Sequence, residues 1–268
     1  MKPAKYVILN PTGNLTTLVT EWGGAEDEPE ITRRLMRVSE QVAYLEPPQQ
    51  AGALARIRMM GGEFCGNAAM ASGGWLVRDR IQPGTEMTVP IEMSGAGSIV
   101  FCRIRGMEEN SFEGTVDMPR VLEIYNTEVR GVPLTAVRTE GILHLIREGR
   151  EPLAEETAEE LLKAAAETVT DDAVGLLDRN PETGSMIPLV FVRASGTTVR
   201  ETACGSGSAA IAAAEAVRRG NGRVLIPVVQ PGGTIRAEAA AENGTVTETA
   251  ITGTVSLGED AGEITLKP

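Results

Sequence analysis

The chain is poor in aromatic residues, histidine and cysteine, and each scarcity narrows the classes of protein to which it can belong. Aromatic side chains make up 3% of the 268 residues, and there is a single histidine. Three widely spaced cysteines are too few for the disulfide framework of a small secreted domain, so a reducing, cytoplasmic setting is expected. The sequence contains no apolar run near the roughly 20 residues that span a bilayer, and it starts toward a strand-like stretch rather than a signal peptide.

Positive charge is also scarce. The 25 lysines and arginines are outnumbered by 37 aspartates and glutamates, which gives a formal net charge of −12. A surface of this sign repels phosphate groups, so neither nucleic acid nor an anionic membrane is an expected partner. Glycine, in contrast, is abundant at 30 residues, which predicts many tight turns and close backbone contacts. The length suits two modest domains or one large one.

Two short segments, residues 61–72 and 199–210, repeat one pattern. Each has Cys-Gly, a small polar residue and then a run of small residues: Cys65-Gly66-Asn67-Ala68 in the first and Cys204-Gly205-Ser206-Gly207 in the second. Asn67 and Ser206 are favoured N-caps, and the alanines that follow favour helix. We therefore expect each cysteine just before a helix N-terminus, where unpaired N–H groups and the helix dipole stabilise a thiolate and bind an anion.

The surrounding pattern predicts a mixture of strands and helices. Strands are expected at 6–9, 15–20, 41–46, 53–60 and 187–192, helices at 30–39, 67–77, 155–169 and 206–219, a turn at Ser195-Gly196, and extended stretches at 87–116, 132–146 and 223–266. The order of elements after each cysteine is similar: residues 93–99 resemble 230–235, and residues 112–116 resemble 242–246. We interpret this as a diverged internal duplication. It predicts two similar α+β halves with a cleft between them and one cysteine at the equivalent position of each.

Two thiols so related suit the inversion of a carbon that bears one hydrogen. Such a reaction needs a base on one face and an acid on the other, and a thiolate and a thiol can exchange these roles. A helix terminus is expected to lower the thiol pKa toward neutrality, which suits general acid–base work. Backbone N–H groups at Gly66-Asn67 and Gly205-Ser206 could stabilise the enediolate-like carboxylate that forms. This chemistry requires neither pyridoxal phosphate nor a metal, and no cysteines are paired at zinc-ligand spacing.

Individually, several of these residues fit an ordinary structural role. A lone cysteine is more often a small buried hydrophobe than a catalyst, and Cys102 on an expected strand is interpreted in that way. Glu40 at a strand start is typical of a solvated residue, and His144 between two leucines is typical of a core residue. The repeated context of Cys65 and Cys204 reverses this interpretation for those two.

Four motifs, taken in order, resemble a known family. They are Asn10-Pro11-Thr12-Gly13-Asn14, Glu63-Phe64-Cys65-Gly66-Asn67-Ala68, Ala203-Cys204-Gly205-Ser206-Gly207 and Gln230-Pro231-Gly232-Gly233. With them the chain resembles the cofactor-independent, two-cysteine amino-acid racemases and epimerases typified by diaminopimelate epimerase. The resemblance implies an α+β fold with two pseudo-symmetric halves, each a curved, mostly antiparallel sheet around a central helix. The halves would be residues 1–119, joined by the C-terminal strand near 256–268, and residues 120–255.

Within that family the chain is similar to the histidine racemases that supply D-histidine for staphylopine-type opine metallophores, which share Glu40-Gln41-Val42 as well as the other motifs. The resemblance implies an isomerase that needs no cofactor and acts on a small amino acid, with a homodimer as one alternative for its assembly. It implies the following roles: Cys65 and Cys204 as acid and base; Gly66, Asn67, Gly205 and Ser206 at the α-carboxylate; Asn14 near the first cysteine; Glu201 at the α-ammonium; Glu40 at the imidazole; and His144 supporting the α-amino site.

Other functions remain open from the sequence. The groups that bind the far end of diaminopimelate differ here, for example in Gly141-Ile142-Leu143-His144, but diaminopimelate epimerase and a racemase of another amino acid are retained as alternatives. A cysteine hydrolase would pair one cysteine with His144 and leave the other cysteine without a role. A non-enzymatic protein that binds a small zwitterion would use the same residues without exchanging a proton.

Overall fold

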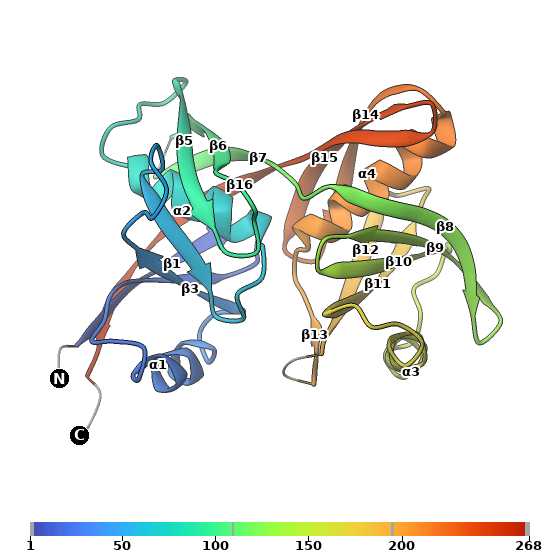
Figure 1. The fold of residues 1–268 in the computed structure, drawn as a ribbon, viewed down its shortest axis with the longest axis horizontal. Coiled ribbons are helices and arrows are strands. Elements are labelled where there is room, and N and C mark those ends of the chain that lie inside the picture. Colours follow the sequence, from blue (N-terminus) through green and yellow to red (C-terminus); the bar gives the residue numbers. More distant parts are fainter. Residues whose placement is uncertain (1–2, 109, 194–195, 266–268) are drawn as a thin grey trace. The chain divides into compact units, whose positions relative to one another are not determined.

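The computed structural model describes residues 3–108, 110–193 and 196–265. The chain divides into two compact units: unit 1 comprises Met1–Asp117 with Thr252–Pro268, and unit 2 comprises Met118–Ile251. Each unit is α+β and consists mostly of sheet, with two helices (Figure 1). Within the described residues, no helix is long and apolar enough to cross a membrane.

The strands of unit 1 close into a ring. The unit contains β1 (Ala4–Pro11), β2 (Thr16–Glu21), α1 (Glu28–Leu35), β3 (Gln41–Glu46), β4 (Ala55–Met59), α2 (Gly66–Val77), β5 (Glu86–Met93), β6 (Val100–Gly106), β7 (Ser111–Asp117) and the C-terminal part of β16 (Thr245–Ile264). They are hydrogen-bonded in the order β1-β2-β3-β4-β5-β6-β7-β16, and β1 also pairs with β16. The ring surrounds α2, which contacts β1, β2, β5, β6 and β7 (Figure 1).

Helix α2 fits inside this ring because its residues are small. All residues from Gly66 to Gly74 are buried. A Cβ added at Gly73 would lie 3.0 Å from Cβ of Cys102, and one added at Gly74 would lie 2.9 Å from the ring of Phe112. The small residues therefore let β6 and β7 approach the helix closely, and this packing fixes the position of its N-terminus.

Helix α1 lies on the outside of the ring. Its Ile31 and Leu35 pack against Val19, Val42 and Tyr44. The sequence predicts this helix at 30–39, and both predicted ends are wrong. The helix begins earlier because a proline lies in its first turn, where the missing N–H has no cost. It ends at Leu35 because the chain must turn to enter β3.

Unit 2 is a single sheet with helices on both faces. Its elements are β8 (Val121–Val129), β9 (Val132–Thr139), β10 (Ile142–Glu148), α3 (Glu155–Ala166), β11 (Ala173–Asn180), β12 (Ser185–Val192), β13 (Thr197–Arg200), α4 (Gly205–Arg219), β14 (Gly222–Gln230), β15 (Gly233–Glu242) and the N-terminal part of β16. The order is β16-β15-β14-β12-β11-β10-β9-β8, and β13 pairs with β12. Helix α4 contacts β8, β9, β10, β14 and β15.

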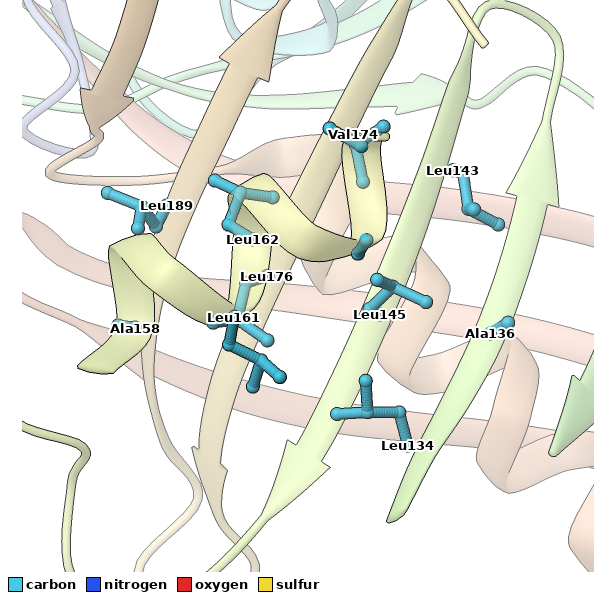
Figure 2. Close-up of a cluster of buried hydrophobic side chains, with 12 residues drawn as sticks. Leu134, Ala136, Leu143, Leu145, Ala158, Leu161, Leu162, Val174, Leu176 and Leu189 are labelled. Atoms are coloured by element: carbon cyan, nitrogen blue, oxygen red, sulfur yellow. The ribbon is translucent and has the colours of Figure 1, made fainter. Parts of the chain in front are cut away.

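Side chains along β10 alternate between two faces of the sheet. Leucines point to one face, and His144 points to the other. Leu143 and Leu145 belong to a buried cluster with Leu161 and Leu162 of α3, and Figure 2 shows the first two on their strand and the last two on the helix. Successive strand residues point to opposite faces, so His144 points away from α3. It meets α4 instead, through Ser206.

Most strongly patterned elements are confirmed, and the errors lie at the ends of elements and in strands that were missed. Strand 41–46 and the helices after each cysteine are observed. The extended stretch at 132–146 is a hairpin that turns at Gly141 (φ +88°), and the helix predicted to 169 ends at Ala166. Strands β8, β11 and β13 were not predicted. Ser195 of the predicted turn, and residues 266–268 of the predicted C-terminal strand, lie outside the described residues.

Candidate functional site

Both cysteines are themselves helix N-caps. Cys65 has extended backbone angles (φ −135°, ψ 110°), and its sulfur accepts a hydrogen bond from the N–H of Ala68 at 3.4 Å. Cys204 has φ −111° and ψ 108°, and its sulfur accepts from the N–H of Gly207 at 3.4 Å. The prediction that Asn67 and Ser206 cap these helices is therefore wrong. Sulfur takes the place usually held by a serine or aspartate oxygen, so each N-cap lies two residues earlier in its motif than expected.

The backbone at the two helix starts has the same arrangement in both units. The first helical hydrogen bonds run from Ala69 N–H to the Cys65 carbonyl at 3.0 Å and from Ser208 N–H to the Cys204 carbonyl at 3.1 Å. The N–H groups of residues 66–67 and 205–206 come before these bonds, at the positive end of each helix. These are the four positions assigned to the α-carboxylate by resemblance.

In unit 1, the thiol of Cys65 contacts a residue that sequence reasoning missed. The thiol donates to Oε1 of Gln41 at 3.2 Å. Nε2 of the same glutamine donates to Oδ1 of Asn14 at 2.9 Å and to Oγ1 of Thr16 at 2.6 Å. Because both N–H bonds of the amide are used in this way, its oxygen must face the sulfur. Gln41 thus fixes the direction of the Cys65 hydrogen bond.

Asn14 connects Gln41 to two further residues singled out in the sequence. Its Nδ2 donates to Oε2 of Glu40 at 2.9 Å, and its Oδ1 also accepts from Nδ2 of Asn67 at 3.1 Å. Asn14 and Asn67 are 4% and 2% exposed, whereas Glu40 is half-buried. Of the predicted unit 1 residues, the structure therefore joins Cys65, Asn14, Glu40 and Asn67 in one hydrogen-bonded network.

The register of two parallel strands builds this network. Strands β2 and β3 pair with Thr16 opposite Gln41, and Glu40 N–H donates to the Leu15 carbonyl at 2.9 Å. The polar residues just before β2 and β3 therefore lie side by side. The sequence offered one usable signal for Gln41, its place next to Glu40 at a strand start, but its contact with Cys65 depends on this register.

In unit 2, Cys204 is followed by a short chain of polar contacts. Its sulfur lies 3.5 Å from Oγ of Ser206, and that oxygen lies 2.9 Å from Nε2 of His144. Cys204 and His144 are 4% and 0% exposed. Of the predicted unit 2 residues, the structure thus groups Cys204, Ser206 and His144, and Glu201 joins them through the thiol.

The predicted lowering of the thiol pKa is not found at Cys204. Burial is the largest influence and raises its pKa well above the ordinary value, and the charge of Glu201 and its hydrogen bond with the thiol raise it further. Hydrogen bonds from Ser206 and the Gly207 N–H oppose this rise without cancelling it. Desolvation of a thiolate beside a carboxylate outweighs the helix terminus, so the resting form of Cys204 is the thiol.

His144 is neutral and enclosed. Burial lowers its pKa to about 4, and its Nδ1 has no hydrogen-bond partner among the described residues. The ring lies over Gly175, where an added Cβ would be 2.4 Å from Nδ1. Its polar contact is with Ser206, so the support that the prediction gives it at the α-amino site would pass through that hydroxyl.

The third cysteine has the structural role that the sequence suggested. Cys102 is 0% exposed and donates to the carbonyl of Ala69 at 3.4 Å. Burial raises the pKa of its thiol to about 12. It is a core residue of β6.

Within the described residues, the surroundings of Cys65 and Cys204 are distinct from two pockets that lie in the separate units. In the described part of the chain, no group of three or more His, Cys, Asp or Glu could hold a metal ion. A pocket of about 270 Å³ in unit 2 is lined by Arg150, Arg179 and Gln230 among others, and one of about 540 Å³ in unit 1 surrounds Trp22. Neither is lined by Cys65 or Cys204.

Comparison with known proteins gives a consistent picture. The family model described as "Histidine racemase CntK N-terminal domain" matches residues 4–262. A histidine racemase from Fusobacterium nucleatum is 27% identical over 215 residues, which cover 77% of this chain and 78% of that protein. A histidine racemase from Staphylococcus aureus is 28% identical over 246 residues, which cover 84% and 85% of the two chains.

Similarity also extends to solved structures. A probable proline racemase from Agrobacterium radiobacter has a TM-score of 0.71 at 15% identity, with 99% of this chain and 94% of that chain covered. At this level of identity the likeness concerns the fold. It agrees with an α+β architecture that extends along nearly the whole chain.

Proposed function

The chain belongs to the histidine racemase CntK N-terminal domain family, and we propose that it interconverts L- and D-histidine without a cofactor. The observation that carries this proposal is the matched position of Cys65 and Cys204. The sulfur of each accepts a hydrogen bond from the N–H of the third residue of the helix that follows. Relatives named histidine racemase support the choice of substrate. The proposal includes a diaminopimelate epimerase-like pair of related halves, one for each cysteine.

In the proposed reaction, the two cysteines act on opposite faces of the α-carbon. The thiolate of one removes the α-proton and becomes a thiol, and the electron pair moves into the carboxylate to give an enediolate-like intermediate. The thiol of the other then donates its proton to the opposite face and becomes a thiolate. The enzyme is left ready for the reverse direction, and general acid–base catalysis of this kind contributes roughly 10²–10⁴-fold for each group.

The α-proton of an amino acid is very weakly acidic, so the intermediate needs strong stabilisation. We assign this to the N–H groups of Gly66, Asn67, Gly205 and Ser206, which precede the first hydrogen bonds of α2 and α4. Fixed N–H dipoles aimed at a developing oxyanion cost no reorganisation during the reaction. Losing a single donor of this type typically lowers kcat by about 10²–10³-fold.

Glu201 is proposed to orient the α-ammonium group of the substrate. In the free protein its carboxylate is one cause of the raised pKa of Cys204. A bound ammonium group would neutralise that charge and favour the thiolate of Cys204. The substrate would in this way help to activate the base that acts on it, while His144 would act on this region through Ser206.

The imidazole of the substrate is proposed to meet Glu40. A carboxylate suits an imidazole N–H, and Glu40 is half-buried and held by Asn14 at 2.9 Å. Asn14 would then connect the side-chain contact to the cysteine network. Replacement of Glu40 by alanine should raise KM for histidine more than KM for an amino acid with an aliphatic side chain.

The direct test is exchange of the α-proton. The purified protein, freed of cofactors by dialysis against chelator, is incubated in deuterium oxide with L- or D-histidine. Deuterium should appear at the α-carbon, and chiral chromatography should show both enantiomers. Failure with every amino acid in a panel that includes diaminopimelate would contradict the proposal, and exchange with diaminopimelate alone would identify the alternative epimerase.

Two further outcomes separate the other classes of function. Binding of histidine without exchange, unaffected by serine at both cysteine positions, would indicate a binding protein. Full turnover of an ester or amide substrate by a Cys65→Ser variant would favour a hydrolase. We further propose a cytoplasmic enzyme whose D-histidine enters opine metallophore synthesis, and a homodimer, which light scattering in solution would test.

A further inference from the structure

The loop that carries Cys204 into α4 has little regular structure of its own. Strand β13 ends at Arg200 and α4 begins at Gly205. The intervening residues need other contacts to hold the sulfur at a fixed point. Those contacts come from the turn between β14 and β15, whose Gly232 N–H donates to the Thr202 carbonyl at 2.8 Å.

Gln230, the last residue of β14, holds Cys204 more directly. Its Oε1 accepts from the backbone N–H of Cys204 at 2.6 Å, and its Nε2 donates to Oγ of Ser208 at 3.0 Å. Oγ of Ser208 in turn donates to the carbonyl of Cys204 at 2.8 Å. Gln230 and Ser208 are 6% and 0% exposed. The peptide groups on both sides of the Cys204 α-carbon are therefore held through one buried amide.

Unit 1 holds its own cysteine loop at a related point but in a different way. Oγ of Ser94 accepts from the N–H of Met59 at 2.9 Å and donates to the carbonyl of Glu63 at 2.8 Å. Glu63 and Thr202 each lie two positions before a cysteine. In each unit, the loop before the cysteine is thus held by the turn after the strand that follows the cysteine's helix, β5 in unit 1 and β14 in unit 2. In unit 2 the side chain of Gln230 adds a contact at Cys204 itself.

The Gln230 contacts hold the backbone from which the sulfur of Cys204 projects. The cap angles of Cys204 place its sulfur 3.4 Å from the Gly207 nitrogen and 3.5 Å from Oγ of Ser206. A rotation of either adjoining peptide group would move Cβ and change both contacts. Proton transfer to carbon is sensitive to such displacement, since a shift of about 1 Å can cost roughly 10²-fold in rate.

We propose that Gln230 is a positioning residue for Cys204, which it aims through the backbone clamp made with Ser208. The proposal rests on the proposed role of Cys204 as acid and base. The hydrogen bonds of Gln230 go to the backbone N–H of Cys204 and to the hydroxyl of Ser208, so it would act on the sulfur through the backbone. Its variants should therefore change the behaviour of one cysteine and leave the other as it is.

The first test measures the thiols without any substrate. Rate constants for alkylation of Cys65 and Cys204 by iodoacetamide are followed in the same sample by peptide mass spectrometry, across a range of pH. Gln230→Met should change the rate constant and apparent pKa of Cys204 several-fold and leave those of Cys65 unchanged. Ser94→Ala is the matched change in unit 1. It should change the rate constant and apparent pKa of Cys65 and leave those of Cys204 unchanged. Should Gln230→Met fold poorly, Ser208→Ala removes one arm of the same clamp with a smaller change in volume.

The second test uses the reaction. Gln230→Met and Ser208→Ala should lower kcat by about 10- to 100-fold with KM for histidine within about twofold. The primary isotope effects measured with α-deuterated L- and D-histidine should become unequal. The isotope effect should increase in the direction of racemisation in which Cys204 is the base, and it should decrease in the direction in which Cys204 is the acid. Ser94→Ala should bias the two directions in the opposite sense.

The outcomes separate the two proposals. Equal changes at both cysteines, or none at either, in folded Gln230→Met and Ser208→Ala would overturn the positioning role even if the enzyme racemises histidine normally. If wild-type protein exchanges no amino acid but Cys204 alkylation still responds selectively, the clamp stands and the racemase proposal fails. A rise in KM with unchanged kcat and thiol rates would place Gln230 in substrate binding and would also overturn the inference.

Discussion

The sulfur of Cys65 lies 3.2 Å from Oε1 of Gln41, and the amide of that glutamine is oriented by Asn14 and Thr16. Its oxygen can only accept, so the thiol of Cys65 is the donor in this contact. At Cys204 the acceptor is the carboxylate of Glu201, which also favours the thiol. The difference is that a carboxylate can be neutralised by the substrate, whereas an amide cannot.

Replacement of Gln41 by glutamate should impair Cys65. The variant puts a negative charge beside the sulfur and removes the two donors that hold Asn14 and Thr16, so the thiol pKa should rise. We expect kcat/KM for histidine to fall about 10²-fold, with the acidic limb of the pH–rate profile moved to higher pH in the direction in which Cys65 is the base. Gln82→Glu, an exposed change in the same unit, is the control. A Gln41→Glu variant with a wild-type profile would show that the amide has no influence on the thiol.

Serine and alanine at the cysteine positions should differ in stability but not in activity. Both changes remove the acid or base, so we expect a loss of about 10²–10⁴-fold in racemisation. Because each cysteine is an N-cap, serine can take over the cap, and alanine cannot. Cys65→Ser should therefore unfold at higher urea than Cys65→Ala, by about 1 kcal/mol in free energy of unfolding. Equal stability of the two variants would show that the cap contributes little.

A methyl group at Gly175 should displace His144. The two residues are paired across β10 and β11, and the added Cβ would lie 2.4 Å from Nδ1 of the ring. We expect Gly175→Ala to lower the free energy of unfolding by about 1–3 kcal/mol and to lower kcat as the contact with Ser206 is lost. Gly97→Ala has open space around its Cβ and should stay within about 0.5 kcal/mol of wild type. Urea denaturation of both variants measures the difference.

The elements that sequence reasoning could predict are those with strong local patterns. The small-residue helix after each cysteine and the strand Gln41–Glu46 needed no tertiary information. Strand β8 was missed because most of its residues are exposed or half-buried, so its apolar pattern is weak. Strand β11 contains Gly175, which lowers strand propensity. That glycine is explained only by the ring of His144 against it.

The residues of the candidate site also fall into two groups, those that local motifs identify and those whose contacts depend on the tertiary structure. Local motifs identify Cys65, Cys204 and the residues after them, because cap chemistry and helix propensity act over a few positions. Gln41 and Gln230 reach their cysteines across 24 and 26 positions of sequence, and strand register decides those contacts. The raised pKa of Cys204 arises mainly from burial, which a motif does not encode. The helix terminus was visible in the sequence, but the larger opposing influence was not.

The buried histidine should make stability depend on pH in a defined window. Burial lowers the pKa of His144 from 6.5 to about 4 in the folded protein. Between these values the unfolded chain binds a proton that the folded chain does not, so the free energy of unfolding falls as the pH is lowered from 6.5 toward 4. The loss amounts to about 3 kcal/mol once the pH is below both values, and stability is unaffected by this group above pH 7.

A His144→Gln variant keeps a donor for Ser206 but has no titrating group. Urea denaturation at a series of pH values should show wild type losing about 3 kcal/mol more than the variant between pH 7 and 4, with the carboxylates contributing equally to both. Parallel curves would mean that the histidine is protonated in the folded state, and hence that it is solvated or paired. Because a neutral His144 cannot titrate near 6.5, the acidic limb of the wild-type pH–rate profile should also survive in the variant.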